Sequence, residues 1–236
     1  MSSEQAAIAK VSVLAEEARA RLFAFVRRAR RPVTRVEAGS AVGISANLAG
    51  FHLDKLVEAG LLTGRGSAPG VLRKVGRAPK YYEATGEFTV SIPPRHPELL
   101  AEILAEAVAD EAAEATPSRT AFDRALAIAT ERGRALGASQ REAERPGRLG
   151  VERALTLACE RLEDAGFEPE RTSPTLVRLR NCPFHPLAAR QPELVCGINQ
   201  AFLAGYLDGL EAARNTAAVL LPAADACCVE LRGRRA

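Results

Sequence analysis

The stretch GISANLAGFHLDKLVEAGLLTGR, residues 43–65, decides the expected fold of the first part of this chain. Ser45 is a favourable N-cap residue, and Gly60 is a favourable stop after the helix that we expect from Ser45 to Glu58. The apolar positions of this helix form one stripe: Ala49, Leu53, Leu56 and Val57. One side of the helix is therefore suited to a core, and the other side is left for solvent or a partner.

The flanking segments complete a helix-turn-helix followed by a β-hairpin. A short helix is expected over residues 35–42, and a turn that contains Gly43 joins it to the helix from Ser45. An amphipathic helix that Pro32 ends precedes both. A strand, a Gly-, Pro- and Arg-rich tip and a returning strand are expected at residues 61–63, 64–80 and 80–85. This hairpin with a basic tip has the features of a wing.

Basic residues are concentrated in the same part of the chain. Residues 1–95 contain 15 Lys and Arg against 8 Asp and Glu, a balance of +7. The remainder contains 17 against 21, a balance of −4, so the net charge of +3 hides an asymmetry. A basic part joined to an acidic part favours a polyanion as the partner of the basic part.

The opening stretch resembles the winged helix-turn-helix of the arsenic-repressor-like bacterial transcription factors, most closely over HLDKLVEAGLL, residues 52–62. The resemblance implies that the helix from Ser45 enters the major groove of double-stranded DNA. Contacts near base edges are expected from Ser45, Asn47 and Phe51, with Asn47 suited to reading adenine. The other expected DNA-binding residues, whose Lys and Arg members would meet phosphates, are His52, Lys55, Arg65, Arg73, Lys74, Arg77 and Lys80. The alternative is a set of solvated charges on a module that binds proteins.

A Pro-rich linker at residues 91–97 leads into a helical middle region. Transcription factors of this type are usually homodimers on palindromic operators, and the helix expected over residues 96–115 is the candidate dimer surface. Packing of this helix within its own chain is the alternative. A further helix is expected over residues 118–137, and the polar stretch 138–148 is expected to be a loop.

The last segment predicts a small α+β domain. Helices are expected over residues 149–165 and 192–210, and strands over 175–182, 216–223 and 227–231. The expected fold class is therefore α+β. The expected domains are a winged helix-turn-helix at 1–90, a linker and helical dimerisation region at 91–147, and a cysteine-containing sensor domain at 148–236.

All five cysteines lie in this last segment. Cys159 shares a helical stripe with Leu155 and Leu162, which predicts a core position. The other four cysteines and one histidine are candidate metal ligands: Cys182, His185, Cys196, Cys227 and Cys228. No C-x2-C pair is present, so the usual zinc-ribbon pattern is absent.

Strand alternation places Cys227 on the packed face with Val229, which favours Cys227 over Cys228 as a ligand. With Cys182, Cys196 and His185 it would give a Cys3His set, acceptable for zinc or for an iron–sulfur cluster. From the residues alone, a metal or cluster site competes evenly with reduced thiols or core residues.

A second resemblance covers LAGFHLDKLVEAGLL and the motifs GFEPE, RLRNCPFHPLA, PELVCGINQAFLAGYLDGL and CCVEL. These motifs resemble the winged-helix repressors of the iron–sulfur-cluster-assembly (suf) operons. The resemblance implies that Cys182, Cys196 and one of Cys227 and Cys228 hold a 2Fe–2S or 4Fe–4S cluster whose state sets DNA affinity. It implies a regulator, of the repressor kind, that responds to iron, oxygen or redox state. The alternative is zinc or reversible thiol oxidation at the same residues.

Other function classes are disfavoured. The apolar runs are too short for a membrane helix, and the first residues lack the pattern of a secretory signal. A cytoplasmic protein is expected, in which thiols stay reduced and structural disulfides are not expected. An enzyme with Cys182 or Cys196 as nucleophile is disfavoured, because His185 is the one nearby histidine and no orienting acid stands in a recognisable motif.

Overall fold

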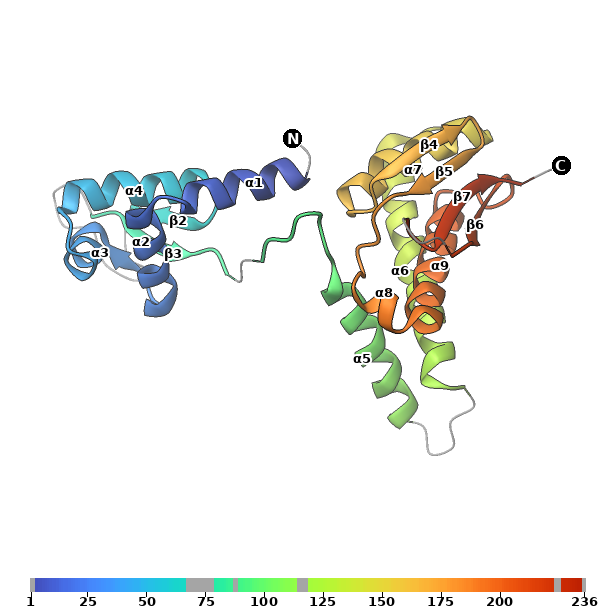
Figure 1. Ribbon diagram of the computed structural model, residues 1–236, viewed down its shortest axis with the longest axis horizontal. Coiled ribbons are helices and arrows are strands. Elements are labelled where there is room, and N and C mark those ends of the chain that lie inside the picture. Colours follow the sequence, from blue (N-terminus) through green and yellow to red (C-terminus); the bar gives the residue numbers. More distant parts are fainter. Residues whose placement is uncertain (1–2, 67–78, 87–88, 114–118, 223–225, 235–236) are drawn as a thin grey trace. The chain divides into compact units, whose positions relative to one another are not determined.

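The structure, a computed structural model, describes residues 3–66, 79–86, 89–113, 119–222 and 226–234. The chain divides into two compact units, Ser3–Ile92 and Pro93–Ala236. Each unit combines helices with a small antiparallel sheet (Figure 1). This arrangement confirms the predicted α+β class.

The first unit is a helical domain with a three-stranded sheet at its edge. Its described elements are α1 (Ser3–Leu14), α2 (Glu17–Ala29), β1 (Val33–Thr34), α3 (Arg35–Val42), α4 (Ala46–Glu58), β2 (Leu62–Arg65) and β3 (Tyr81–Ala84). Leu22, Val33, Leu53 and Tyr82 are buried in one core that these elements share. The predicted helix-turn-helix is thus confirmed.

Local capping explains where the helices of this unit begin. The Glu16 carboxylate accepts hydrogen bonds from the first amides of α2, and Thr34 and Glu37 form a reciprocal capping box at α3. The Ser45 hydroxyl accepts from the amide of Leu48 at 3.3 Å and caps α4, as predicted. Each cap satisfies amide groups that a helix start leaves without an intrahelical partner.

The turn between α3 and α4 depends on two glycines. Gly43 ends α3 with φ of +80°, a backbone conformation that other residues rarely adopt. A Cβ atom on Gly39 would lie 2.9 Å from the carbonyl oxygen of Ile44 and 3.2 Å from the Cβ of Ala49. The two helices therefore approach closely at Gly39, which fixes how α4 is presented.

The sheet of the first unit has the strand order β1-β3-β2 and is antiparallel. In its register Leu62 pairs with Ala84 and Arg65 pairs with Tyr81, so β2 and β3 form the predicted hairpin. The basic tip of that hairpin, with Arg73, Lys74 and Arg77, lies outside the described residues.

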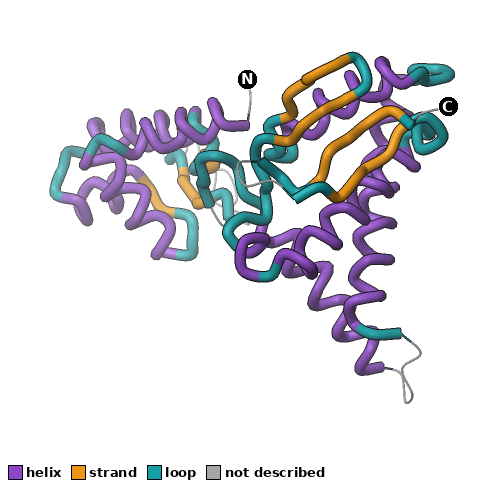
Figure 2. Tube along the Cα trace, turned by 45° about the vertical axis from the view of Figure 1, so that its right-hand side comes forward, coloured by secondary structure: helices purple, strands orange, loops and turns teal. Residues whose placement is uncertain are grey.

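The second unit packs a four-stranded sheet beside its helices, as Figure 2 shows with strands in orange. Its described elements are α5 (Pro97–Ala113), α6 (Ala121–Glu144), α7 (Val151–Asp164), β4 (Pro169–Ser173), β5 (Leu176–Leu179), α8 (Leu187–Arg190), α9 (Pro192–Gly209), β6 (Thr216–Leu220) and β7 (Val229–Gly233). The strand order is β4-β5-β7-β6 with antiparallel pairing throughout. Val177, Leu179, Val229 and Leu231 of the sheet join Leu155 and Leu162 of α7 in one core.

One expectation for this unit is wrong, and one of its strands was not predicted. The stretch 138–148 was expected to be a loop, but α6 continues through most of it to Glu144. The reason is a buried contact: the Tyr206 hydroxyl donates to Gln140 Oε1, and Gln140 Nε2 donates to the Leu157 carbonyl at 3.1 Å. The strand β4 was not expected, because its sequence PERTS is polar and lacks the alternation of apolar residues that indicates a strand. In the structure this strand is mostly exposed.

Helices α6 and α9 run side by side in a close backbone contact. A Cβ on Gly133 or Gly137 of α6 would lie 1.9 or 2.2 Å from a carbonyl oxygen of α9. A Cβ on Gly205 or Gly209 of α9 would lie 2.0 Å from a carbonyl oxygen of α6. Because these distances are shorter than any real contact of a Cβ atom, the packing requires glycine at all four positions.

The helix α5 uses its apolar face inside its own unit. Leu100, Ile103 and Ala107 are buried in the core of the second unit, and α5 packs against α6. These three side chains therefore pack within their own chain, as in the alternative stated above, and do not form a dimer surface. None of the described helices combines the length and apolar character needed to cross a lipid bilayer.

Candidate functional site

The outward side of α4 and its N-cap carry the three residues expected at base edges. Ser45, Asn47 and Phe51 are exposed, and the Phe51 side chain is 56% exposed although it is apolar. The Ser45 hydroxyl already accepts the hydrogen bond that caps α4, which leaves its O–H donor and one acceptor position for a partner. The N-terminal half of α4 thus presents one amide and one aromatic ring to a partner.

Sequence reasoning missed other side chains on this surface. Leu48 is 44% exposed and Val36 of α3 is 62% exposed, which is unusual for aliphatic side chains in a small domain. Arg35 lies across Gly50, with its Cδ 3.2 Å from where a Cβ would stand. The available signal was that Leu48 falls outside the apolar stripe of α4 while lying next to Asn47.

His52 must be removed from the expected DNA contacts. Its side chain is buried at 8% exposure, and its Nδ1 lies 3.6 Å from the Glu16 carboxylate. The same carboxylate caps α2, and hydrogen bonds from the amides of Arg19 and Ala18 lower its pKa. His52 therefore lies on the inner side of α4, against the residue that begins α2.

The described basic residues of the expected set differ in what they contact. Lys55 forms an ion pair with Glu58 at 2.7 Å, and Lys80 forms one with Asp54 at 2.6 Å. Asp54 also accepts from the Tyr82 hydroxyl at 2.9 Å, so Asp54 of α4 holds Lys80 and β3 against this helix. Arg65 is exposed at the end of β2. Surface pairs of this kind are weak and exchange readily for phosphate contacts.

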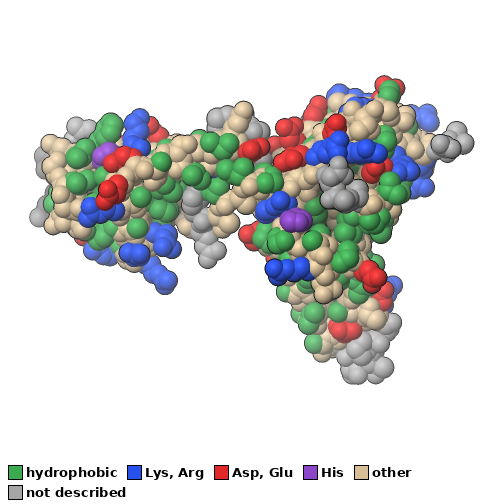
Figure 3. All heavy atoms as spheres, in the orientation of Figure 1, with side chains coloured by type: hydrophobic (Ala, Val, Ile, Leu, Met, Phe, Trp, Pro, Cys, Tyr) green, Lys and Arg blue, Asp and Glu red, His purple; other side chains and the backbone are tan. Residues whose placement is uncertain are grey.

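Figure 3 shows Lys and Arg side chains gathered along one edge of the first unit, the lower edge in that view. The last turn of α2 carries Arg27 and Arg28, and Arg30 and Arg31 follow it. These residues add to the positive charge of the unit that carries α4. The unit therefore has both the exposed helix and the positive charge that contact with DNA requires.

The cysteines of the second unit form two neighbouring pairs. Cys182 follows β5, Cys196 lies in α9, and Cys227 and Cys228 directly precede β7. The backbone places the last two: the Cys227 amide donates to the Leu179 carbonyl at 2.8 Å, and the Leu221 amide donates to the Cys228 carbonyl at 2.7 Å. Segments far apart in sequence thus bring four sulfur atoms into one region.

Cys196 and Cys228 are joined as a disulfide, with their Cα atoms 6.1 Å apart and a sequence separation of 32. The expectation that all cysteines are reduced is therefore wrong for this pair. Both residues are buried at less than a tenth exposure. The bond links α9 to the segment that leads into β7.

Cys182 and Cys227 form a hydrogen-bonded thiol pair. The hydrogen bond from Cys227 lowers the pKa of Cys182 to about 7, and the backbone amides of Phe184 and His185 act in the same direction. The same contact, together with burial, raises the pKa of Cys227. Cys182 is therefore the thiolate of the pair and Cys227 is the donor. A thiolate is the form that binds metals and reacts with oxidants.

Asn199 is a member of this site that sequence reasoning did not identify. Its side-chain amide donates to the Cys227 sulfur at 3.1 Å, and its side chain is completely buried. Its carbonyl oxygen is buried without a hydrogen-bond partner. The signal in the sequence was its position three residues after Cys196, on the same side of α9.

The turn that carries Cys182 is fixed from both sides. Asn181 is buried and accepts a hydrogen bond from Arg95 at 2.7 Å, and Arg95 also donates to the Cys182 carbonyl. The His96 amide donates to the Pro183 carbonyl at 3.0 Å. The residues that begin the second unit thus hold this turn in place.

His185, the last residue of the expected ligand set, and Cys159, the residue expected in the core, lie apart from the two cysteine pairs. The His185 side chain is exposed, and its backbone amide donates to the Cys182 carbonyl at 3.0 Å. Cys159 is half-buried and packs against the core beside Leu155 and Leu162, and burial raises its pKa. Cys159 is therefore a packing residue in the place that its helical stripe predicted.

In the part of the chain that the structure describes, no group of three or more His, Cys, Asp or Glu side chains is arranged to hold a metal ion. The sulfur atoms are instead paired two by two. Four cysteine sulfurs and the buried Asn199 amide nevertheless lie in one region, and thiolate sulfurs are the ligands that zinc and iron–sulfur clusters use. Opening the Cys196–Cys228 bond by reduction would release the other two thiols.

Comparison with known proteins bears on the first unit. Residues 14–65 match a family model described as a helix-turn-helix domain. No curated protein matches the chain, and no solved structure matches it. The matched segment runs from the end of α1 to the end of β2, so it contains α3, α4 and the close turn between them. The match supports a DNA-binding transcriptional regulator of the helix-turn-helix type.

Proposed function

We propose that this protein is a cytoplasmic, homodimeric transcriptional repressor whose affinity for a palindromic operator is set by an iron–sulfur cluster on the cysteines of its second unit. The observation that carries the proposal is the convergence of Cys182, Cys196, Cys227 and Cys228 from three separate segments of one α+β unit. In this proposal the helix-turn-helix binds DNA, and the state of the cluster on the cysteines sets how tightly it binds.

The exposed surface of α4 supports the DNA-binding half of the proposal. Asn47 offers a donor and an acceptor for an adenine edge, and Phe51 and Leu48 offer apolar contact for thymine methyl groups. Arg65 and the arginines after α2 are placed on the same unit for phosphate contacts.

The chemistry of the donor set supports the sensing half. Reduced Cys182, Cys196, Cys227 and Cys228 would hold the cluster, which would supply a redox- and iron-dependent link between their segments. We favour a fourth cysteine over His185 as the last ligand, because Cys228 is buried beside Cys196 whereas His185 is exposed. Asn199 would donate its amide hydrogen bond to the ligand sulfur of Cys227.

Such a site would act by holding three segments in one geometry. Cys182 lies at the end of β5, Cys196 lies in α9, and Cys228 leads into β7. Loss of the shared link would free the turn at Cys182, which is hydrogen-bonded to Arg95 at the start of the second unit. A coupling of about 1–3 kcal/mol between the two sites would change DNA affinity roughly 5- to 150-fold.

Reversible thiol oxidation is the second candidate, and the Cys196–Cys228 bond favours it. In that case two thiols lose two electrons and two protons to an oxidant such as a peroxide, and reduction by a dithiol reverses the step. Zinc is the third possibility for the same sulfurs and would require that this bond be reduced.

Anaerobic purification followed by a visible spectrum and by iron, sulfide and zinc analysis separates these candidates. The proposal expects a coloured protein with iron and sulfide, and expects Cys182→Ser and Cys196→Ser to lose both. Cys159→Ser is the matched control and should keep them, because Cys159 packs in the core. A colourless, iron-free protein that still regulates would overturn cluster sensing and leave DNA binding to be judged by gel shift.

A further inference from the structure

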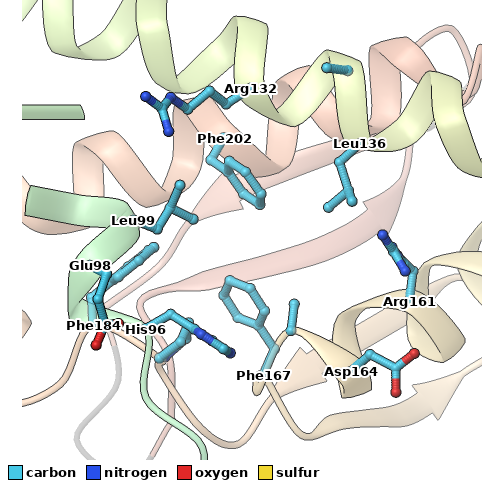
Figure 4. Close-up of a pocket in the computed structure, with 13 residues that line it drawn as sticks. His96, Glu98, Leu99, Arg132, Leu136, Arg161, Asp164, Phe167, Phe184 and Phe202 are labelled. Atoms are coloured by element: carbon cyan, nitrogen blue, oxygen red, sulfur yellow. The ribbon is translucent and has the colours of Figure 1, made fainter. Parts of the chain in front are cut away.

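A separate hollow of about 540 Å³ lies within the second unit, and its size is that of a small-molecule site. Three aromatic rings, Phe167, Phe184 and Phe202, line it together with Leu99 and Leu136. Figure 4 shows Phe167 and Phe202 approaching the hollow from opposite sides. The two rings therefore border the same largely apolar space.

One cation is directed into this hollow. The Arg161 guanidinium points toward the open space in Figure 4, whereas the carboxylates of Asp164 and Glu98 point away from it. Arg161 forms no ion pair with any side chain that the structure describes, although it also borders a smaller hollow that Glu144 and Glu160 line. Its charge is therefore available to a ligand.

The other cations of the wall differ from Arg161. Arg132 is engaged by Glu102 at 2.7 Å and by Glu106 at 2.9 Å. The His96 ring extends toward Phe167 in Figure 4 and offers a hydrogen-bond donor beside the apolar space. The combination is an apolar slot with one unpaired cation and one imidazole at its margin.

We propose that this hollow binds a small aromatic carboxylic acid, with its ring between Phe167 and Phe202 and its carboxylate on Arg161. A guanidinium matches a carboxylate with two parallel hydrogen bonds, and a partly desolvated pair is stronger than one in water. The two aromatic walls would contact the ligand ring.

The hollow adjoins the turn that carries Cys182. Pro183 and Phe184 of that turn form part of its wall, and His96 is hydrogen-bonded to Pro183. A bound acid would therefore restrain the same segment that the cysteines act upon, which makes it a second input to the regulator. This link rests on the proposed function, but binding of the acid does not.

Calorimetric titration of the full chain with benzoate and phenylacetate, and with neutral benzamide and phenylacetamide, tests the proposal without DNA or cluster. At least one carboxylate should bind saturably at one per chain, and its amide should bind at least about tenfold more weakly, since a charge-assisted pair is lost. Arg161→Gln should remove this preference. Arg153→Gln, an exposed change on the same helix, should keep it.

A second variant separates binding from folding. Ala135 is exposed on α6 and lines the hollow, so Ala135→Phe should fill the space and abolish binding while the circular dichroism and melting curve stay native. The absence of saturable binding by either carboxylate would overturn the proposal. So would an affinity that Arg161→Gln leaves unchanged, or equal affinity for acid and amide. None of these results depends on whether the cysteines hold a cluster.

Discussion

The side-chain amide of Asn199 donates a hydrogen bond to the sulfur of Cys227 across 3.1 Å, while the carbonyl oxygen of the same side chain is buried without a partner. An unsatisfied buried carbonyl costs free energy of folding, roughly 1–3 kcal/mol. A leucine at this place would avoid that cost. We therefore assign the Asn199 amide a task at the cysteines, the donation of a hydrogen bond to the Cys227 sulfur.

Asn199→Leu tests this idea. In metal-free protein the free energy of unfolding should change by less than about 1 kcal/mol or rise, because the unpaired carbonyl is removed along with the amide. The iron content after anaerobic purification should fall, because Cys227 loses its hydrogen-bond donor. Urea unfolding and iron analysis on the same preparation measure both. A strongly destabilised variant that keeps its iron would contradict this assignment.

The reactivity of Cys182 should follow its lowered pKa. In reduced, metal-free protein, alkylation of Cys182 by iodoacetamide should rise with pH around an apparent pKa of about 7, because the thiolate is the reactive form. Cys227→Ala removes the hydrogen bond that lowers this pKa, so the rise should move to higher pH. Mass spectrometry of the modified peptides gives the rates.

Cys159 is the internal control for that experiment. Burial raises the pKa of Cys159, so its alkylation at pH 7 should be much slower than that of Cys182. Equal rates at the two cysteines, or an unchanged profile in Cys227→Ala, would show that the thiol pair does not set the reactivity.

The contact between α6 and α9 should tolerate no added methyl group. Gly137→Ala would place a Cβ 2.2 Å from the Tyr206 carbonyl oxygen, so the helices must separate. We expect a loss of about 3 kcal/mol or more in the free energy of unfolding, at the upper end of overpacking effects. Gly150→Ala is the control: its Cβ would meet nothing within 4 Å, and the loss should stay below about 1 kcal/mol. Urea denaturation of both variants measures the two free energies of unfolding. Equal losses in the two variants would contradict the close contact between α6 and α9.

DNA recognition should depend on the outer side of α4. Asn47→Ala should weaken operator binding by about 1–3 kcal/mol and relax the preference at one base pair, while non-specific binding changes little. His52→Gln should leave that preference unchanged, because His52 faces Glu16 inside the domain. Gel shifts with operator and scrambled DNA at several salt concentrations compare the two. A loss of base preference in His52→Gln would place that residue on the DNA surface after all.

The sequence predicts the first unit well because the signals there are local. Ser45, Gly43 and the stripe through Leu53 act within a few residues, and the structure confirms each of them. The end of α6 was missed because Gln140 depends on Tyr206, a residue 66 positions away. Likewise, a residue pattern cannot show which cysteine meets which, since the pairing follows from how β5, α9 and β7 come together.

The glycine contact also has a mechanical consequence. With carbonyl oxygens of each helix against the backbone of the other, α9 has no room to roll or slide on α6. Cys196 and Asn199 therefore lie on a helix whose position is fixed by its contact with α6. A change at the sulfur atoms must therefore move the less tightly packed segments beside α9, which are the Cys182 turn and the residues before β7. Because the Cys182 turn is hydrogen-bonded to Arg95, such a motion is directed toward the start of the second unit.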